Sequence, residues 1–178
     1  MIDESFLPAD LVALARRVVV GNRAIGRTVA LAESCTGGLV AAALTEIPGC
    51  SAVLDRAYIT YSNEAKTESL GVPSDLIETF GAVSIATAWA MARGALEKSR
   101  ADVAVAVSGV AGPDGGTAFK PVGTVVFATA RRGGDAEPDG ELRHFDGASR
   151  SVIRLQAAMA ALELLLPPQP VAETGGEP

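Results

Sequence analysis

The sequence predicts an α/β domain with three layers, α/β/α, in which helices flank a central sheet. Two observations carry this prediction. Short apolar runs alternate with helical patterns along the chain, and the two most apolar runs, residues 28–32 and 102–107, each pass directly into a glycine-rich loop. Because ligands of such folds bind at the carboxyl ends of the strands, we expect these two loops to form part of a functional site.

The 178 residues are enough for one domain, since domains commonly have about 100–200 residues. We assign residues 1–166 to that domain. Residues 167–178 are rich in proline and glycine and have few apolar side chains to bury, so we expect a disordered tail there.

The first half of the chain begins with a helix expected over residues 8–20, because Leu11, Leu14 and Val18 share one face and Gly21–Asn22 follow. The remaining elements are a strand at 28–32, a helix at 39–46, a strand at 57–62, a helix capped by Asn63 and ended by Gly71, and a short helix from Ser74 to Gly81.

The second half begins with a long amphipathic helix for which Ser84 is the expected N-cap. A strand at 102–107 and a pair of strands at 122–129 and 142–145 follow. The final helix has an apolar stripe that consists of Val152, Leu155, Met159, Leu162 and Leu166.

Composition excludes several classes of protein. One histidine and two cysteines exclude multi-histidine metal sites and zinc ribbons, and we expect neither a metal nor another cofactor. A net charge of −6 and 4% aromatic residues disfavour nucleic acid as a partner. The longest uncharged stretch, residues 79–92, is shorter than the roughly 18 apolar residues of a membrane span. An acidic N-terminus and so few cysteines favour the cytoplasm.

Ser34 lies between the first apolar strand and a helix, in the loop Glu33–Gly38. Free N–H groups and the helix dipole at such a position can stabilise a developing oxyanion, which suits a nucleophile. A simpler interpretation is that Ser34 or Thr36 only caps the helix. Position in the sequence leaves both open.

A serine nucleophile needs a base. His144 has no sequence sign of an orienting carboxylate and is more typical of a surface strand residue. Lys66 is one turn into the helix that follows residues 61–63, but its pKa, about 10.4 when free, would have to fall through burial or like charge. The alternative is an exposed lysine paired with Glu64 or Glu68.

The second glycine-rich loop, residues 108–116, matches neither the dinucleotide fingerprint nor the P-loop, which disfavours a dinucleotide enzyme or an NTPase. Such a loop after a buried strand still allows close approach to a ligand. Arg150 and Arg154, four residues apart, could hold a phosphate.

Five segments together carry a resemblance to a known family: residues 32–38, 60–66, 108–116, 120–125, and 145–147 with Arg150 and Arg154. In order and spacing they resemble the CinA C-terminal domain family, over residues 8–166. Stand-alone members of that family act as nicotinamide-nucleotide amidases. The resemblance therefore implies hydrolysis of the carboxamide of nicotinamide mononucleotide to nicotinate mononucleotide and ammonia, in pyridine nucleotide salvage.

The resemblance also implies roles for individual residues. Ser34 would be the nucleophile, Lys66 the general base, and Tyr61 a hydrogen-bonding partner that orients or shuttles the proton. Arg150 would hold the substrate phosphate. Further substrate-binding candidates, some of them for the oxyanion, are Thr36, Gly37, Asn63, Ser108, Gly109 and Gly112.

Two other functions remain open from the sequence: a nucleotide-binding or regulatory module that performs no chemistry, and an amidase for a different small amide. A homo-oligomer is also expected, because small α/β salvage enzymes often complete their sites across interfaces. The alanine-rich stretch 86–95 could pack inside one subunit or between two.

Overall fold

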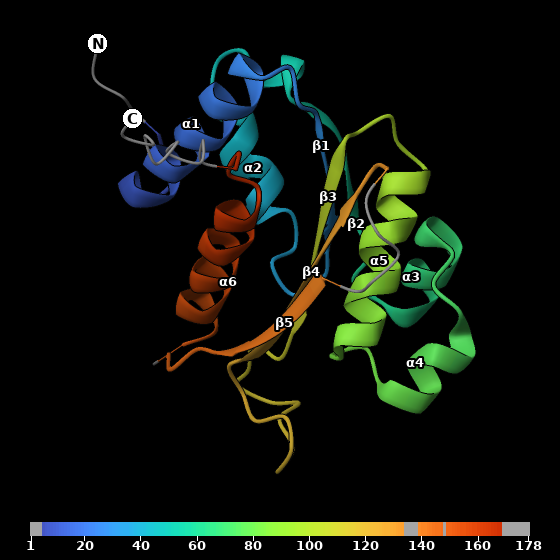
Figure 1. Ribbon diagram of the computed structural model, residues 1–178. Helices are drawn as coiled ribbons and strands as arrows, with labels where there is room; N and C mark the ends of the chain where they lie inside the picture. The colour runs from blue at the N-terminus through green and yellow to red at the C-terminus, as the bar shows by residue number, and fades with distance from the viewer. Residues whose placement is uncertain (1–4, 134–138, 148, 169–178) are drawn as a thin grey trace, which may run out of the picture.

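The computed structural model describes residues 5–133, 139–147 and 149–168. These residues form a five-stranded mixed sheet with the order β2-β1-β3-β4-β5 (Figure 1). The strands are β1 (Val29–Glu33), β2 (Leu54–Ile59), β3 (Val103–Gly109), β4 (Thr124–Arg131) and β5 (Asp139–His144). β1 pairs in parallel with β2 and β3, whereas β4 runs antiparallel to β3 and β5.

Helices cover both faces of the sheet, which confirms the three-layer α/β/α fold (Figure 1). One layer consists of α1 (Ala9–Ala24), α2 (Leu39–Thr45) and α6 (Arg150–Leu164). The other consists of α3 (Asn63–Leu70), α4 (Ser74–Phe80) and α5 (Ile85–Glu97), and a 3₁₀ turn, Cys50–Ala52, leads into β2. Within the described ranges, no helix is long and apolar enough to span a membrane.

The two faces of the central strands differ in side-chain size. Branched and aromatic side chains face α1, α2 and α6: Val29, Leu31, Val103, Val105, Val107, Val125 and Phe127. Mostly small side chains face α5: Ala30, Ala32, Ala104, Ala106, Val126, Ala128 and Ala130. The buried Ala88, Ala92 and Ala95 of α5 pack on this second face, so the alanine-rich stretch packs inside the chain.

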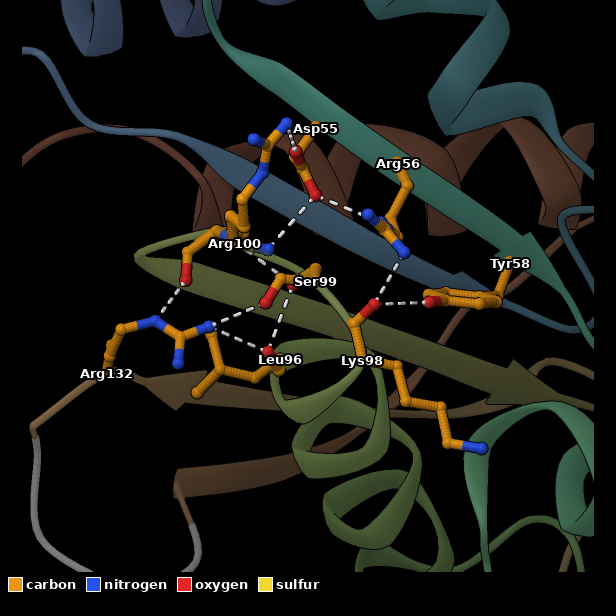
Figure 2. Close-up of polar contacts among 9 residues, drawn as sticks. Asp55, Arg56, Tyr58, Leu96, Lys98, Ser99, Arg100 and Arg132 are labelled. Carbon is orange, nitrogen blue, oxygen red and sulfur yellow. Dashed lines mark hydrogen bonds and ion pairs between the residues drawn. The ribbon is translucent and has the colours of Figure 1, made fainter.

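The C-terminal end of α5 is tied to the sheet by donors from β2 and from the residue after β4 (Figure 2). Arg132 donates to the carbonyls of Leu96 and Ser99, and Arg56 and Tyr58 both donate to the carbonyl of Lys98. Cations suit a helix C-terminus because its unpaired carbonyls carry partial negative charge. These contacts fix the C-terminal end of α5 against the sheet.

Two expected boundaries in the first half of the chain were wrong. α1 continues past Gly21–Asn22 to Ala24, because the buried Asn22 side chain donates to the carbonyls of Val18 and Leu165 and so ties this turn of the helix to the end of α6. β2 occupies Leu54–Ile59 in place of residues 57–62, since its register with β1 ends at Glu33.

Two side-chain expectations were also wrong. Ser62, and not Asn63, caps α3: its hydroxyl accepts a hydrogen bond from the N–H of Ala65. The apolar face of α6 is offset from the expected stripe, with Val152 40% exposed and Ile153 buried. Ser84 caps α5 and Gly71 ends α3 in a left-handed conformation, as expected. The expected tail extends, from residue 169 onwards, outside the described residues, and the boundary at 166 remains a prediction.

Candidate active site

Ser34 follows directly on β1, at the carboxyl end of the central strands. Its N–H donates to the carbonyl of Val107 on β3, which extends the sheet pairing by one residue. Gly37 and Gly38 then turn the chain into α2 with positive φ angles of 60° and 91°. Ser34 is 7% exposed, so only a small part of it faces solvent.

Lys66 extends from the first half of α3 to Ser34. Its Nζ lies 3.1 Å from the Ser34 Oγ, and it also lies 2.9, 3.2 and 3.3 Å from the backbone carbonyl oxygens of Thr60, Tyr61 and Ser62. The residue is 1% exposed. The structure therefore excludes the exposed lysine paired with Glu64 or Glu68.

Burial lowers the pKa of Lys66, an effect that Glu64 and, if it were ionised, the Cys35 thiol would partly oppose. Burial also raises the pKa of the Cys35 thiol to about 11, so that this thiol is uncharged at neutral pH and supplies no negative charge to the lysine. A neutral Lys66 amine can donate its two protons to backbone carbonyls and direct its lone pair at the Ser34 hydroxyl.

The N-terminus of α2 is occupied by a side chain that the sequence did not single out. The Glu33 carboxylate accepts hydrogen bonds from the N–H groups of Gly38, Val40 and Ala41 at 3.0, 3.2 and 2.9 Å, and Glu33 is 1% exposed. The expectation that these helix N–H groups are free to stabilise an oxyanion is therefore wrong. Capping by Ser34 or Thr36 is excluded as well, since neither side chain bonds to the helix.

The loop between Ser34 and α2 contains other N–H groups that could donate to an oxyanion. Among the residues that the structure describes, the N–H group of Thr36 has no hydrogen-bond acceptor, and that of Cys35 has only the sulfur of its own side chain. Arg154 fixes the same two residues through their carbonyls, with its Nε 3.1 Å from the Cys35 oxygen and its Nη2 2.7 Å from the Thr36 oxygen. Arg154 thus holds this loop by its backbone carbonyls, a role that the sequence did not suggest.

A pocket of about 190 Å³ opens over Ser34. The residues that line it are Ser34, Cys35, Tyr61, Asn63, Lys66, Ala82, Val83, Ser108, Gly109, Ala111 and Arg150. At the exposed rim, Arg150 donates to the Tyr61 hydroxyl at 2.6 Å and to the Gly112 carbonyl at 2.7 Å. Arg150 therefore connects the loop before α3 with the loop after β3.

The pocket brings together seven of the ten residues expected from the sequence: Ser34, Tyr61, Lys66, Asn63, Ser108, Gly109 and Arg150. The other three, Thr36, Gly37 and Gly112, do not line it. His144 does not line it either, and its Nε2 lies 3.5 Å from Oδ1 of Asp146. The Tyr61 hydroxyl bonds to Arg150, while the Tyr61 carbonyl bonds to Lys66. Sequence reasoning missed Ala82 and Val83, whose only signal was their position directly before the Ser84 cap.

Comparison with known proteins supports the family resemblance found in the sequence. Residues 11–167 match the family model described as the CinA C-terminal domain. The chain belongs to this family.

CinA relatives of two lengths match the chain. A putative competence-damage inducible protein from Symbiobacterium thermophilum is 53% identical over 146 residues, which are 79% of this chain but 34% of that protein. The chain thus spans about a third of the length of the first curated relatives. A relative in Escherichia coli K12, named nicotinamide-nucleotide amidohydrolase PncC, is 46% identical over 157 residues, 88% of this chain and 93% of that protein.

Solved CinA structures have the same fold. The crystal structure of competence/damage inducible protein CihA from Agrobacterium tumefaciens matches with a TM-score of 0.86 and 50% identity, over 90% of this chain and 96% of that one. A CinA superfamily protein from Escherichia coli matches with a TM-score of 0.81 and 32% identity, over 91% and 93% of the two chains.

Proposed function

We propose that this chain is a nicotinamide-nucleotide amidohydrolase, which hydrolyses the carboxamide of nicotinamide mononucleotide to nicotinate mononucleotide and ammonia. The observation that carries the proposal is the buried amine of Lys66 beside the Ser34 hydroxyl, in a pocket with Arg150 at its rim. Relatives of about this length support it: those named PncC from Escherichia coli and Pseudomonas putida are matched over 93% and 95% of their chains.

In the proposed acylation step, the Ser34 oxygen attacks the carboxamide carbon while the neutral Lys66 amine accepts the hydroxyl proton. The tetrahedral intermediate then collapses with breakage of the C–N bond. The lysine ammonium returns its proton to the leaving nitrogen, which departs as ammonia and leaves an ester on Ser34. A water molecule, deprotonated by the same amine, then attacks this ester. The lysine ammonium returns the proton to the departing Ser34 oxygen, and the acid product loses its proton to solvent and leaves as the carboxylate.

The N–H groups of Cys35 and Thr36 are the proposed donors to the oxyanion. They belong to the two residues after the nucleophile, and Cys35 lines the pocket. Donors of this kind stabilise charge that develops only in the transition state. The clamp from Arg154 onto both carbonyls would hold them in position.

Arg150 and Tyr61 are proposed to form the phosphate end of the site. The Arg150 guanidinium is exposed at the rim and has the planar donor arrangement that suits phosphate oxygens. The hydrogen bond to the Tyr61 hydroxyl orients it. Tyr61 is thus proposed to act as an orienting residue at the rim.

Ammonia release measured in parallel from nicotinamide mononucleotide, free nicotinamide and nicotinamide adenine dinucleotide tests the proposal. We expect the mononucleotide to be the best substrate. Faster release from another amide would identify an amidase of different specificity. Nucleotide binding without ammonia release from any of the three, by folded protein, would instead support a binding or regulatory module.

We further propose that the chain forms a homo-oligomer. Large apolar side chains remain exposed near the carboxyl end of the sheet and on the loop before β4: Ile59, Phe80 and Phe119 are 57%, 53% and 94% exposed. A partner that covers them would stabilise the assembly. Mass measured by light scattering during size-exclusion chromatography tests this, and a monomer at micromolar concentration would contradict it.

The cytoplasm is the proposed compartment. Both cysteines are free thiols, and Cys35 lies beside the nucleophile, where a reducing environment would keep it unmodified. Fractionation of cells that express the tagged protein tests this assignment, and recovery outside the cytoplasm would contradict it.

A further inference from the structure

One wall of the pocket comes from the segment between α4 and α5, which contributes Ala82 and Val83. Both side chains are apolar and pack in part against the core beneath α5, whereas the nucleophile and its base lie among polar groups in the same pocket. The catalytic proposal above uses neither residue. Their place in the pocket therefore calls for a separate explanation.

Side chains bind three successive carbonyls here, the last one of α4 and the first two of the segment that follows it. Lys120 donates to the Phe80 carbonyl at 2.9 Å, and Ser84 and Thr87 donate to the Gly81 carbonyl at 3.0 and 2.8 Å. The Ser108 hydroxyl on β3 donates to the Ala82 carbonyl at 2.9 Å. These donors come from different parts of the chain, so the segment is fixed to the sheet and to α5 as a preformed surface.

The volume of the pocket limits what it can take. About 190 Å³ is below the roughly 300–1,000 Å³ of sites that enclose a drug-sized ligand. A flat aromatic ring with its carboxamide suits such a space, whereas a ribose and a phosphate would extend past the rim toward Arg150.

We infer that Ala82 and Val83 form the surface on which the pyridine ring of the substrate packs, and that Val83 limits the size of the ring that reaches Ser34. This inference rests on the proposed function. The polar side chains Ser34, Asn63 and Lys66 lie at the same pocket, where they are available to the carboxamide, so the aliphatic side chains are left for the ring. The Ser108 hydroxyl, already engaged by the Ala82 carbonyl, supports this wall.

Sulfonyl fluorides of increasing size test the inference without use of the amidase reaction. The Ser34 oxygen attacks sulfur, fluoride leaves, and the hydroxyl proton passes to Lys66, so one covalent sulfonate forms per site. Rates of modification by methane-, benzene- and naphthalenesulfonyl fluoride are measured by mass spectrometry on wild type, Val83→Phe and Val83→Ala. Val20→Phe, the same change at an exposed valine on α1, is the matched control.

We expect Val83→Phe to lower the benzene-to-methane rate ratio by about tenfold or more, and Val83→Ala to raise the naphthalene-to-benzene ratio by a similar factor. Val20→Phe should change neither ratio. Unchanged ratios in both Val83 variants, with circular dichroism spectra like that of wild type, would overturn the inference. Failure of even the methane reagent to modify wild-type Ser34 would overturn it too, because the pocket must admit the smallest reagent.

The same experiment separates this inference from the proposed function. If the rate ratios change in the Val83 variants but the protein releases no ammonia from nicotinamide mononucleotide, the pocket wall binds an aromatic group and the amidase assignment is rejected. Normal ammonia release with unaltered ratios would reject the wall alone.

Discussion

The Nζ of Lys66 lies 3.1 Å from the Oγ of Ser34 and 2.9 Å from the carbonyl oxygen of Thr60. Contacts with the next two carbonyls add to this arrangement. The backbone before α3 thus determines where the amine lies, while burial lowers its pKa. A lysine in this position differs from a surface lysine in both its orientation and its pKa.

Replacement of Lys66 with methionine should lower kcat for ammonia release by about 10²- to 10⁴-fold, the usual contribution of a positioned general base. Methionine retains much of the length of the side chain but lacks the amine. Lys98→Met, at an exposed lysine after α5, is the control and should retain full activity. A Lys66→Met enzyme within a few-fold of wild type would show that the base lies elsewhere.

Activity should rise with pH through the pKa of Lys66, which lies below the ordinary lysine value of 10.5. The neutral amine is the active form, so protonation as the pH falls removes the base and lowers kcat/KM. The profile from pH 5 to 10 should show an acidic limb and reach a plateau before the ordinary lysine pKa. A rate that stays constant down to pH 5, or falls as the pH rises toward 8, would contradict this role.

Arg150→Met should raise KM for nicotinamide mononucleotide by about tenfold or more, because a charge-assisted contact to phosphate is lost. Any turnover of free nicotinamide, which has no phosphate, should change little. Tyr61→Phe is the matched variant, since it removes only the hydroxyl that accepts from Arg150, and its effect on KM should be smaller and in the same direction. Equal losses on both substrates in Arg150→Met would argue against the phosphate assignment.

Glu33→Ala should lower the free energy of unfolding by about 3 kcal/mol, because three N–H groups at the start of α2 lose a charged acceptor. Glu97→Ala, at an exposed glutamate paired with Arg93, should cost less than about 1 kcal/mol. Urea denaturation measures both. Similar losses in the two variants would mean that the Glu33 carboxylate contributes no more than a surface ion pair.

Sequence patterns predicted the layers because apolar strands and amphipathic helices must each bury one face. They failed where a side chain from a distant element decides the outcome. Nothing near Asn22 reveals that its amide reaches the Leu165 carbonyl and allows α1 to continue. Glu33 shows the same limit at the site, since its place next to Ser34 says nothing of the three helix N–H groups it binds.

In the candidate site, too, the sequence pointed to some residues, whereas others are distinguished only by the packing. The need of a serine for a base in a chain with one histidine made Ser34 and Lys66 a candidate pair, the family resemblance implied their roles, and the fold brings the two side chains together. Arg150 and Arg154 look alike in sequence, four residues apart on α6, yet one lies at the pocket rim and the other binds the carbonyls of the nucleophile loop. Only the packing of α6 against that loop distinguishes them.

The central claim is that Ser34 is the nucleophile of an amidase, and ammonia release from nicotinamide mononucleotide by wild type and Ser34→Ala tests it most directly. Ser34→Ala removes one oxygen from a residue that is 7% exposed, so the fold should persist and can be verified by circular dichroism. We predict steady release by wild type and a rate at least about 10³-fold lower for Ser34→Ala. Comparable rates in the two proteins, or no release by folded wild type, would contradict the account.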